Sequence, residues 1–79
     1  MITEYIKAAM RQAQYEMLED NTFYGEIDAL TGCYANEDSL EACRDELESV
    51  VEDWILFSLT QQLPLPVVDG VKLEVKKVA

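Results

Sequence analysis

The sequence predicts an α+β fold in which a three-stranded antiparallel sheet packs on one long helix. Two observations favour this fold. Apolar residues recur at helical spacing between Asp38 and Leu59, and short segments that alternate apolar and polar residues precede this stretch. A short N-terminal helix and a C-terminal strand complete the expected order α-β-β-β-α-β. Because 79 residues leave room for one thin core, we expect residues 1–79 to form a single domain.

The long helix is expected over Ser39–Leu59. Asp38 or Ser39 can accept from its first backbone N–H groups, and Glu41 stands three residues after Asp38, as in a capping box. From Trp54 the polar residues thin out, so we expect the last two turns to be buried in this chain or against another. The predicted apolar stripe consists of Leu40, Cys43, Leu47, Val50, Val51, Trp54 and Phe57.

The N-terminal half reads as a helix followed by three strands. We expect the helix over Met1–Gln14, where apolar residues return at helical spacing. The strands are expected at Tyr15–Glu19, Thr22–Asp28 and Cys33–Ala35, with the first two joined by a turn at Asp20-Asn21.

The central strand has one apolar side and one polar side. Its alternation places Tyr24, Glu26 and Asp28 together on the face exposed to water. Gly25 lies on the other face, where the missing side chain suits close packing of a helix over the sheet.

The segment after the long helix begins with Leu63-Pro64-Leu65-Pro66, which we expect to be a stiff, non-helical connector. Asp69-Gly70 predicts a turn. Val71–Val75 then alternates apolar and charged residues and is expected to form the last strand.

Composition narrows the classes of function. The chain has no histidine, and the spacing of Cys33 and Cys43 is not that of a zinc site, so we expect no metal and no cofactor. Cys43 lies on the helix stripe, where we expect a buried reduced thiol. No segment has the apolar length that spans a bilayer, which predicts a soluble, cytoplasmic protein without a membrane partner.

The formal net charge of −10 disfavours direct binding to nucleic acid, because acidic surfaces repel phosphate backbones. The acids are concentrated: eight of them lie between Glu37 and Asp53, against one basic residue, Arg44. Two interpretations remain open for this acidic helix face, a solvated surface or a surface that meets a basic partner. The thin core also predicts association into a homo-dimer or higher homo-oligomer.

Several segments together resemble the HicB family of antitoxins. The similarity extends from about Tyr15 to Gly70 and rests on the order of these pieces more than on any one of them. The segments that carry it are the strand Phe23-Tyr24-Gly25-Glu26-Ile27, the turn Leu30-Thr31-Gly32-Cys33, the acidic helix cap Asn36-Glu37-Asp38-Ser39, the helix from Leu40 through Leu56, and the exit Leu63-Pro64-Leu65-Pro66.

This resemblance implies a partial ribonuclease H-like fold and an antitoxin that neutralises HicA, a small basic toxin that cleaves messenger RNA. Many HicB antitoxins also carry a C-terminal DNA-binding module, whereas nine residues follow Gly70 here, and we expect no operator binding. A likeness to ribonuclease H does not transfer catalysis.

The sequence predicts a binding protein instead of an enzyme. Glu26 and Asp28 share a face, but a magnesium nuclease needs more convergent carboxylates. Tyr24 and Tyr34 are either interface anchors or ordinary sheet residues. The expected partner-binding residues form two sets. Contacts that hold a complex are expected on the open face of the sheet, at Tyr24, Glu26, Asp28 and Tyr34, and acids that steer a basic partner are expected on the helix, at Asp45, Glu48 and Glu52. The alternative function is a free-standing acidic homo-oligomer with a regulatory or scaffolding role and no toxin partner.

Overall fold

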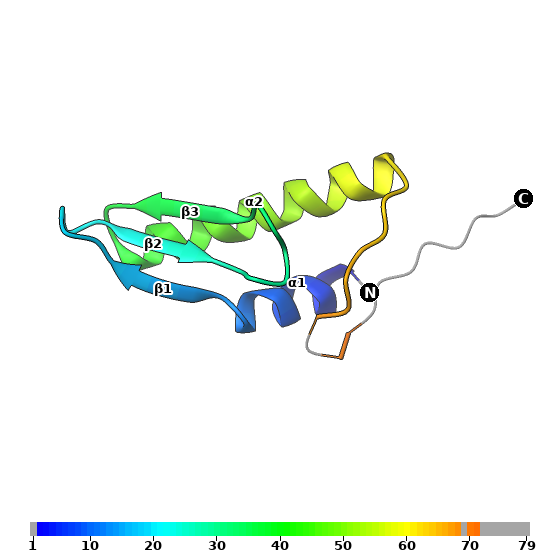
Figure 1. Ribbon diagram of the computed structural model, residues 1–79, viewed down its shortest axis with the longest axis horizontal. Coiled ribbons are helices and arrows are strands. Elements are labelled where there is room, and N and C mark those ends of the chain that lie inside the picture. The colour runs from blue at the N-terminus through cyan, green and yellow to red at the C-terminus, as the bar shows by residue number, and fades with distance from the viewer. Residues whose placement is uncertain (1, 69, 72–79) are drawn as a thin grey trace, which may run out of the picture.

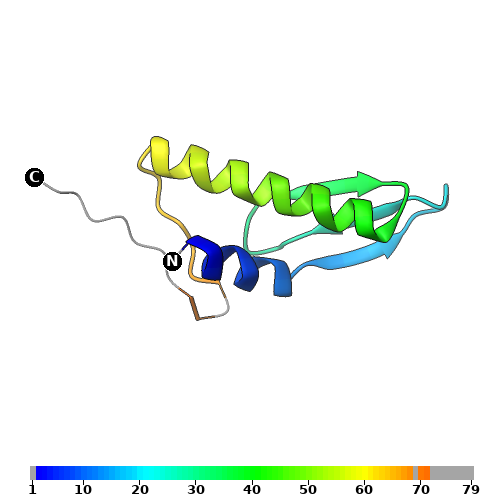
Figure 2. The ribbon, with the colours of Figure 1, turned by 180° about the vertical axis from the view of Figure 1, so that it is seen from behind.

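The computed structural model describes residues 2–68, 70 and 71, and it has the predicted α+β architecture. The strands form one antiparallel sheet in the order β1-β2-β3, and α2 lies along one face of it (Figure 1). Figure 2 shows that α2 extends beyond the sheet, where α1 lies beside it. The elements are α1 (Ile2–Arg11), β1 (Gln14–Met17), β2 (Phe23–Glu26), β3 (Tyr34–Glu37) and α2 (Leu40–Thr60).

The first helix is shorter than predicted and the first strand begins earlier. Helix α1 ends at Arg11 because Gln12 and Ala13 close a turn back to Ala9 and Met10 through backbone hydrogen bonds of 3.0 and 3.2 Å. Strand β1 ends at Met17 instead of Glu19. The next residue, Leu18, already belongs to the hairpin turn, in which the Leu18 N–H donates to the Thr22 carbonyl at 2.8 Å.

The predicted turn at Asp20-Asn21 is confirmed. Asn21 has φ of 66°, a left-handed conformation that asparagine tolerates better than most residues. The Asp20 Oδ1 atom accepts from the Thr22 backbone N–H at 3.1 Å and from the Thr22 hydroxyl at 2.6 Å. These hydrogen bonds lower the pKa of Asp20, so the turn is held by an ionised carboxylate.

The third strand is Tyr34–Glu37 instead of the predicted Cys33–Ala35. Asn36 and Glu37 pair with Tyr24 and Phe23 of β2, so residues that were interpreted as a helix cap extend the sheet. Only Ser39 caps α2, by accepting from the Ala42 N–H at 3.1 Å. This resolves the choice between Asp38 and Ser39.

The buried stripe of α2 is narrower than predicted. Steps of four residues place Cys43, Leu47, Val51 and Ile55 against the core. Val50 and Trp54 are half-buried, whereas the predicted burial of Leu40 and Phe57 is wrong: they are 48% and 59% exposed. Within this chain the last turns of α2 are not fully buried either, since Leu56 is 61% exposed. This part of the helix extends past the sheet, which therefore covers none of it (Figure 2).

Helix α1 and the segment after α2 are joined through Tyr5. This side chain is fully buried, and its hydroxyl donates to the Pro66 carbonyl at 2.6 Å. The contact holds the proline-containing connector against the core. Of the predicted C-terminal strand, only Val71 is described; it forms an isolated antiparallel bridge with Val68, and residues 72–75 lie outside the described residues.

Gly25 lies where the Tyr15 ring and the Cys43 side chain of α2 pack closely against the sheet. A Cβ atom at this position would lie 2.8 Å from the Tyr15 ring and 3.2 Å from the Cys43 Sγ atom. The expectation that glycine permits close packing of the helix over the sheet is confirmed.

Replacement of Leu47 by alanine should lower the free energy of unfolding by about 2–5 kcal/mol, because Leu47 is fully buried and the change leaves a cavity. Urea unfolding followed by circular dichroism measures this loss. Leu40→Ala, at a 48% exposed position of the same helix, is the control and should change stability far less. Equal losses for the two variants would contradict the described core.

The two cysteines should react slowly with thiol reagents. Both thiols are free and buried, and burial raises the pKa of Cys33 and of Cys43, so the reactive thiolate is disfavoured. An Ellman assay should show slow reaction of the native protein at pH 8 and fast reaction in denaturant. Immediate labelling of the native protein would place these thiols outside the core.

Candidate functional site

The face of the sheet opposite α2 is open and carries most of the predicted site. Directly paired residues of antiparallel strands point to the same face, so the strand register defines this surface. Gly25 and Ala35 face α2, and their neighbours along the strands face away. The open sheet face consists of Gln14, Glu16, Tyr24, Glu26, Tyr34 and Asn36.

Two tyrosines form the apolar centre of the open sheet face. The rings of Tyr24 and Tyr34 stack with their centroids 6.2 Å apart and an interplanar angle of 27°. Tyr34 is 59% exposed, and Tyr24 is half-buried. The pair therefore offers a flat aromatic surface at low entropic cost, since each ring already holds the other in place.

A carboxylate borders these rings. The Tyr24 hydroxyl donates to the Glu26 Oε2 atom at 3.2 Å. Desolvation, followed by this hydrogen bond and the negative charge of Glu26, raises the pKa of Tyr24 above its usual value. Tyr24 therefore keeps its proton at neutral pH, while Glu26 retains lone pairs for further donors.

Four residues of the predicted site, three on the sheet and Asp28 in the loop after β2, converge on one hollow. A concavity of about 210 Å³ lies beside the end of β2, and Tyr24, Glu26, Asp28 and Tyr34 all line it. Gly32, with φ of +94°, turns the loop that closes its far side. Apolar rings and two carboxylates thus share one concave surface, which suits a partner that offers cationic and apolar groups together.

The sequence interpretation missed Asn36. Its Nδ2 atom donates to the Thr22 hydroxyl and to the Phe23 carbonyl, both at 2.9 Å, and so ties β3 to β2 beside the tyrosine pair. Asn36 was interpreted as part of the helix cap. The signal that places it is its register opposite Tyr24, which a sequence pattern does not provide.

The three helix acids of the predicted site do not join the tyrosines. Helix α2 covers the opposite face of the sheet, and Asp45 and Glu52 are exposed on that helix. Glu48 is half-buried and lines a different hollow, between α1 and α2. The predicted residues therefore fall into two separate groups.

The described part of the chain offers little for metal chemistry. Within residues 2–68, 70 and 71, no group of three or more His, Cys, Asp or Glu side chains is placed to hold a metal ion. Over the same residues, no helix has the length and apolar character needed to cross a membrane.

Comparison with known proteins places this architecture in a family. Residues 4–66, from α1 to the proline connector, match the family described as UPF0150-like. The chain belongs to the UPF0150-like family. The match includes every residue of the open sheet face.

A solved structure is similar to this chain over almost its whole length. The protein TTHA0281 from Thermus thermophilus has 36% sequence identity and a TM-score of 0.90, over 96% of this chain and 95% of that protein. No curated protein matches the sequence. The fold of this UPF0150-like chain is thus shared with a protein whose crystal structure is known.

Proposed function

We propose that this UPF0150-like chain is a HicB-like antitoxin, which binds a small basic HicA-type mRNA-cleaving toxin and covers its RNA-binding face. The observation that carries the proposal is the hollow at the edge of the open sheet face, where two stacked tyrosines lie beside Glu26 and Asp28. Family membership is compatible with this function.

The charges support a basic protein as the partner. A toxin that cleaves RNA needs a positive surface for phosphates, and this chain has a formal net charge of −10. Arg and Lys side chains of such a surface would find acceptors in Glu26 and Asp28. The same net charge opposes direct binding to nucleic acid, so the proposed ligand is the toxin.

The aromatic pair supplies the contact area. Tyrosine is enriched among the residues that dominate binding energy, because a rigid ring buries much surface and its hydroxyl still forms a hydrogen bond. Neutralisation then requires occupancy of the toxin surface and no chemical step. We propose accordingly that the chain is not an enzyme.

The acids of α2 have a smaller part in this proposal. Asp45 and Glu52 lie on the opposite side of the sheet from the tyrosines, and exposed charges are screened over roughly 8 Å at physiological ionic strength. They can steer the approach of a basic protein without touching it. Solubility remains an equally simple role for these residues.

Replacement of Tyr34 by alanine should raise the dissociation constant for the toxin about thirtyfold, mainly through faster dissociation, if the ring is a central anchor of the interface. Phe57→Ala is a matched control, because Phe57 is an aromatic residue that is also 59% exposed but lies on α2. The probe is a purified small basic toxin of the HicA type, and its binding is measured by biolayer interferometry. Equal losses in the two variants would contradict the assigned face.

Neutralisation of the helix acids should give a different kinetic signature. Asp45→Asn with Glu52→Gln should slow association and weaken its salt dependence, while the dissociation rate stays nearly unchanged. Stopped-flow association at several salt concentrations measures both effects. A large change in the dissociation rate would place the toxin on α2 instead of the open sheet face.

Co-expression of the chain with the same HicA-type toxin tests the function itself. Co-purification and rescue of growth are the expected results. If the two proteins do not co-purify and growth is not restored, the antitoxin proposal is contradicted. The result would then favour the alternative function, a free-standing homo-oligomer with a regulatory or scaffolding role.

A further inference from the structure

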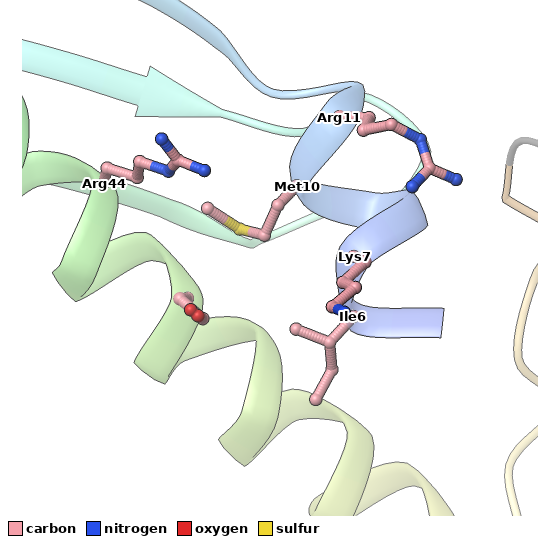
Figure 3. A pocket seen from close by; sticks show the side chains of 6 residues that line it. Ile6, Lys7, Met10, Arg11 and Arg44 are labelled. Atoms are coloured by element: carbon pink, nitrogen blue, oxygen red, sulfur yellow. The ribbon is translucent and has the colours of Figure 1, made fainter. Parts of the chain in front are cut away.

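A trough between α1 and α2 stands apart from the open sheet face. A hollow of about 420 Å³ is lined by Ile6, Lys7, Met10, Arg11, Arg44 and Glu48 (Figure 3). A second hollow of about 410 Å³ shares Met10, Arg11 and Arg44 with the first and continues toward Tyr15 of β1. We call this continuous surface the basic trough.

The basic trough collects the positive charge of the described structure. Lys7, Arg11 and Arg44 are all the lysine and arginine residues within residues 2–68, 70 and 71, and all three line it. Two acids, Glu41 and Glu48, also line its walls. Positive charge therefore exceeds negative charge here, in a chain whose formal net charge is −10.

The trough is also partly apolar. Ile6 and Met10 are half-buried and point from α1 toward α2 (Figure 3). Methionine adapts its shape to different apolar groups. A fitting ligand therefore combines apolar side chains with carboxylates, and Glu41 and Glu48 disfavour a run of phosphates.

The same chain presents such a segment at the tip of its β1–β2 hairpin. Met17 is 62% exposed and Leu18 is 36% exposed, and they are followed by the exposed acids Glu19 and Asp20. Two neighbouring apolar side chains at a loop tip, with carboxylates beside them, have the chemistry that the basic trough accepts.

The hairpin tip is held in a fixed shape. The Leu18 N–H donates to the Thr22 carbonyl at 2.8 Å, and the Asn21 N–H donates to the Leu18 carbonyl at 3.0 Å. A preorganised loop loses little conformational entropy when it binds. In Figures 1 and 2 the tip lies at the end of the sheet away from α1, so it does not fill the trough of its own chain.

We propose that the hairpin tip of one copy docks in the basic trough of a second copy. Two such contacts related by a two-fold axis close a dimer, because each copy offers one tip and one trough. The dimer does not depend on the proposed antitoxin function, since neither surface includes the tyrosine pair. This contact would be the interface of the homo-dimer that we expect from the small size of the core.

Charge reversal tests the contact on the full chain. Glu19→Lys changes the tip and spares Asp20, which holds the turn through Thr22. Arg44→Glu changes the trough. Each variant alone should raise the dimer dissociation constant about tenfold or more, because like charges then meet at both contacts. Sedimentation velocity measures the association, and circular dichroism checks the fold.

Mixing the two variants gives the sharper result. In a mixed dimer, the reversed tip meets the reversed trough, and the native tip meets the native trough. Both contacts are then attractive, so the mixture should form a heterodimer about as tightly as the parent chain does. Glu46→Lys, at an exposed position of α2 outside both surfaces, is the control and should leave the parent dimer intact.

Three results would overturn the proposal. In the first, the parent chain stays monomeric at about 1 mM. In the second, neither charge reversal weakens the association. In the third, the mixture of the two variants associates no better than each variant alone. If both variants still bind a HicA-type toxin, the open sheet face has kept its proposed function. Failure of this dimer is therefore separable from failure of the antitoxin proposal.

Discussion

The close packing of α2 on the sheet at Gly25 is the constraint on which the structure depends. There is no room for a side chain at this position, because the Tyr15 ring and the Cys43 Sγ atom occupy the space that a Cβ would need. Cys43 in turn reaches the Ala35 carbonyl of β3, with Sγ and O 3.6 Å apart. One contact region therefore joins all three strands to the long helix.

This packing also decides which surface is available for binding. A domain with one long helix can cover only one face of its sheet, so the other face remains open. Strand register then sets what that face displays: the tyrosine pair, Glu26 and Asn36. Successive side chains along a strand point to opposite faces of the sheet. This alternation buries the small residues against α2 and exposes the large polar residues on the open sheet face.

The fold class followed from local patterns because its elements have clear periods. The ends of helices and strands were less predictable from the sequence, because they depend on which elements lie beside them in the fold. Asn36 and Glu37 belong to β3 because β2 lies opposite them and pairs with them. The burial of the α2 stripe was overestimated at Phe57 for a similar reason. Helical spacing predicts which residues share a face, but not how far the sheet extends beneath that face.

The residues of the candidate site also differ in how well local sequence patterns predict them. Tyr24, Glu26 and Asp28 lie two residues apart on or just after one strand, so a period of two was enough to group them. The acids of α2 were assigned a separate, steering role by their charge. The structure places them apart from the sheet residues, because α2 lies on the other face of the sheet. The basic trough had no local signal, since Arg44 meets Lys7 and Arg11 only through the packing of α1 beside α2.

We propose that the open sheet face, and not the acidic side of α2, binds a basic partner protein. Nuclear magnetic resonance mapping of the isotope-labelled chain, titrated with a small basic HicA-type toxin, tests this assignment most directly. We expect amide shift changes concentrated in β2, β3 and the loop that follows β2, with little change at Asp45 and Glu52. Changes concentrated along the outer side of α2, with the tyrosine pair unaffected, would contradict it.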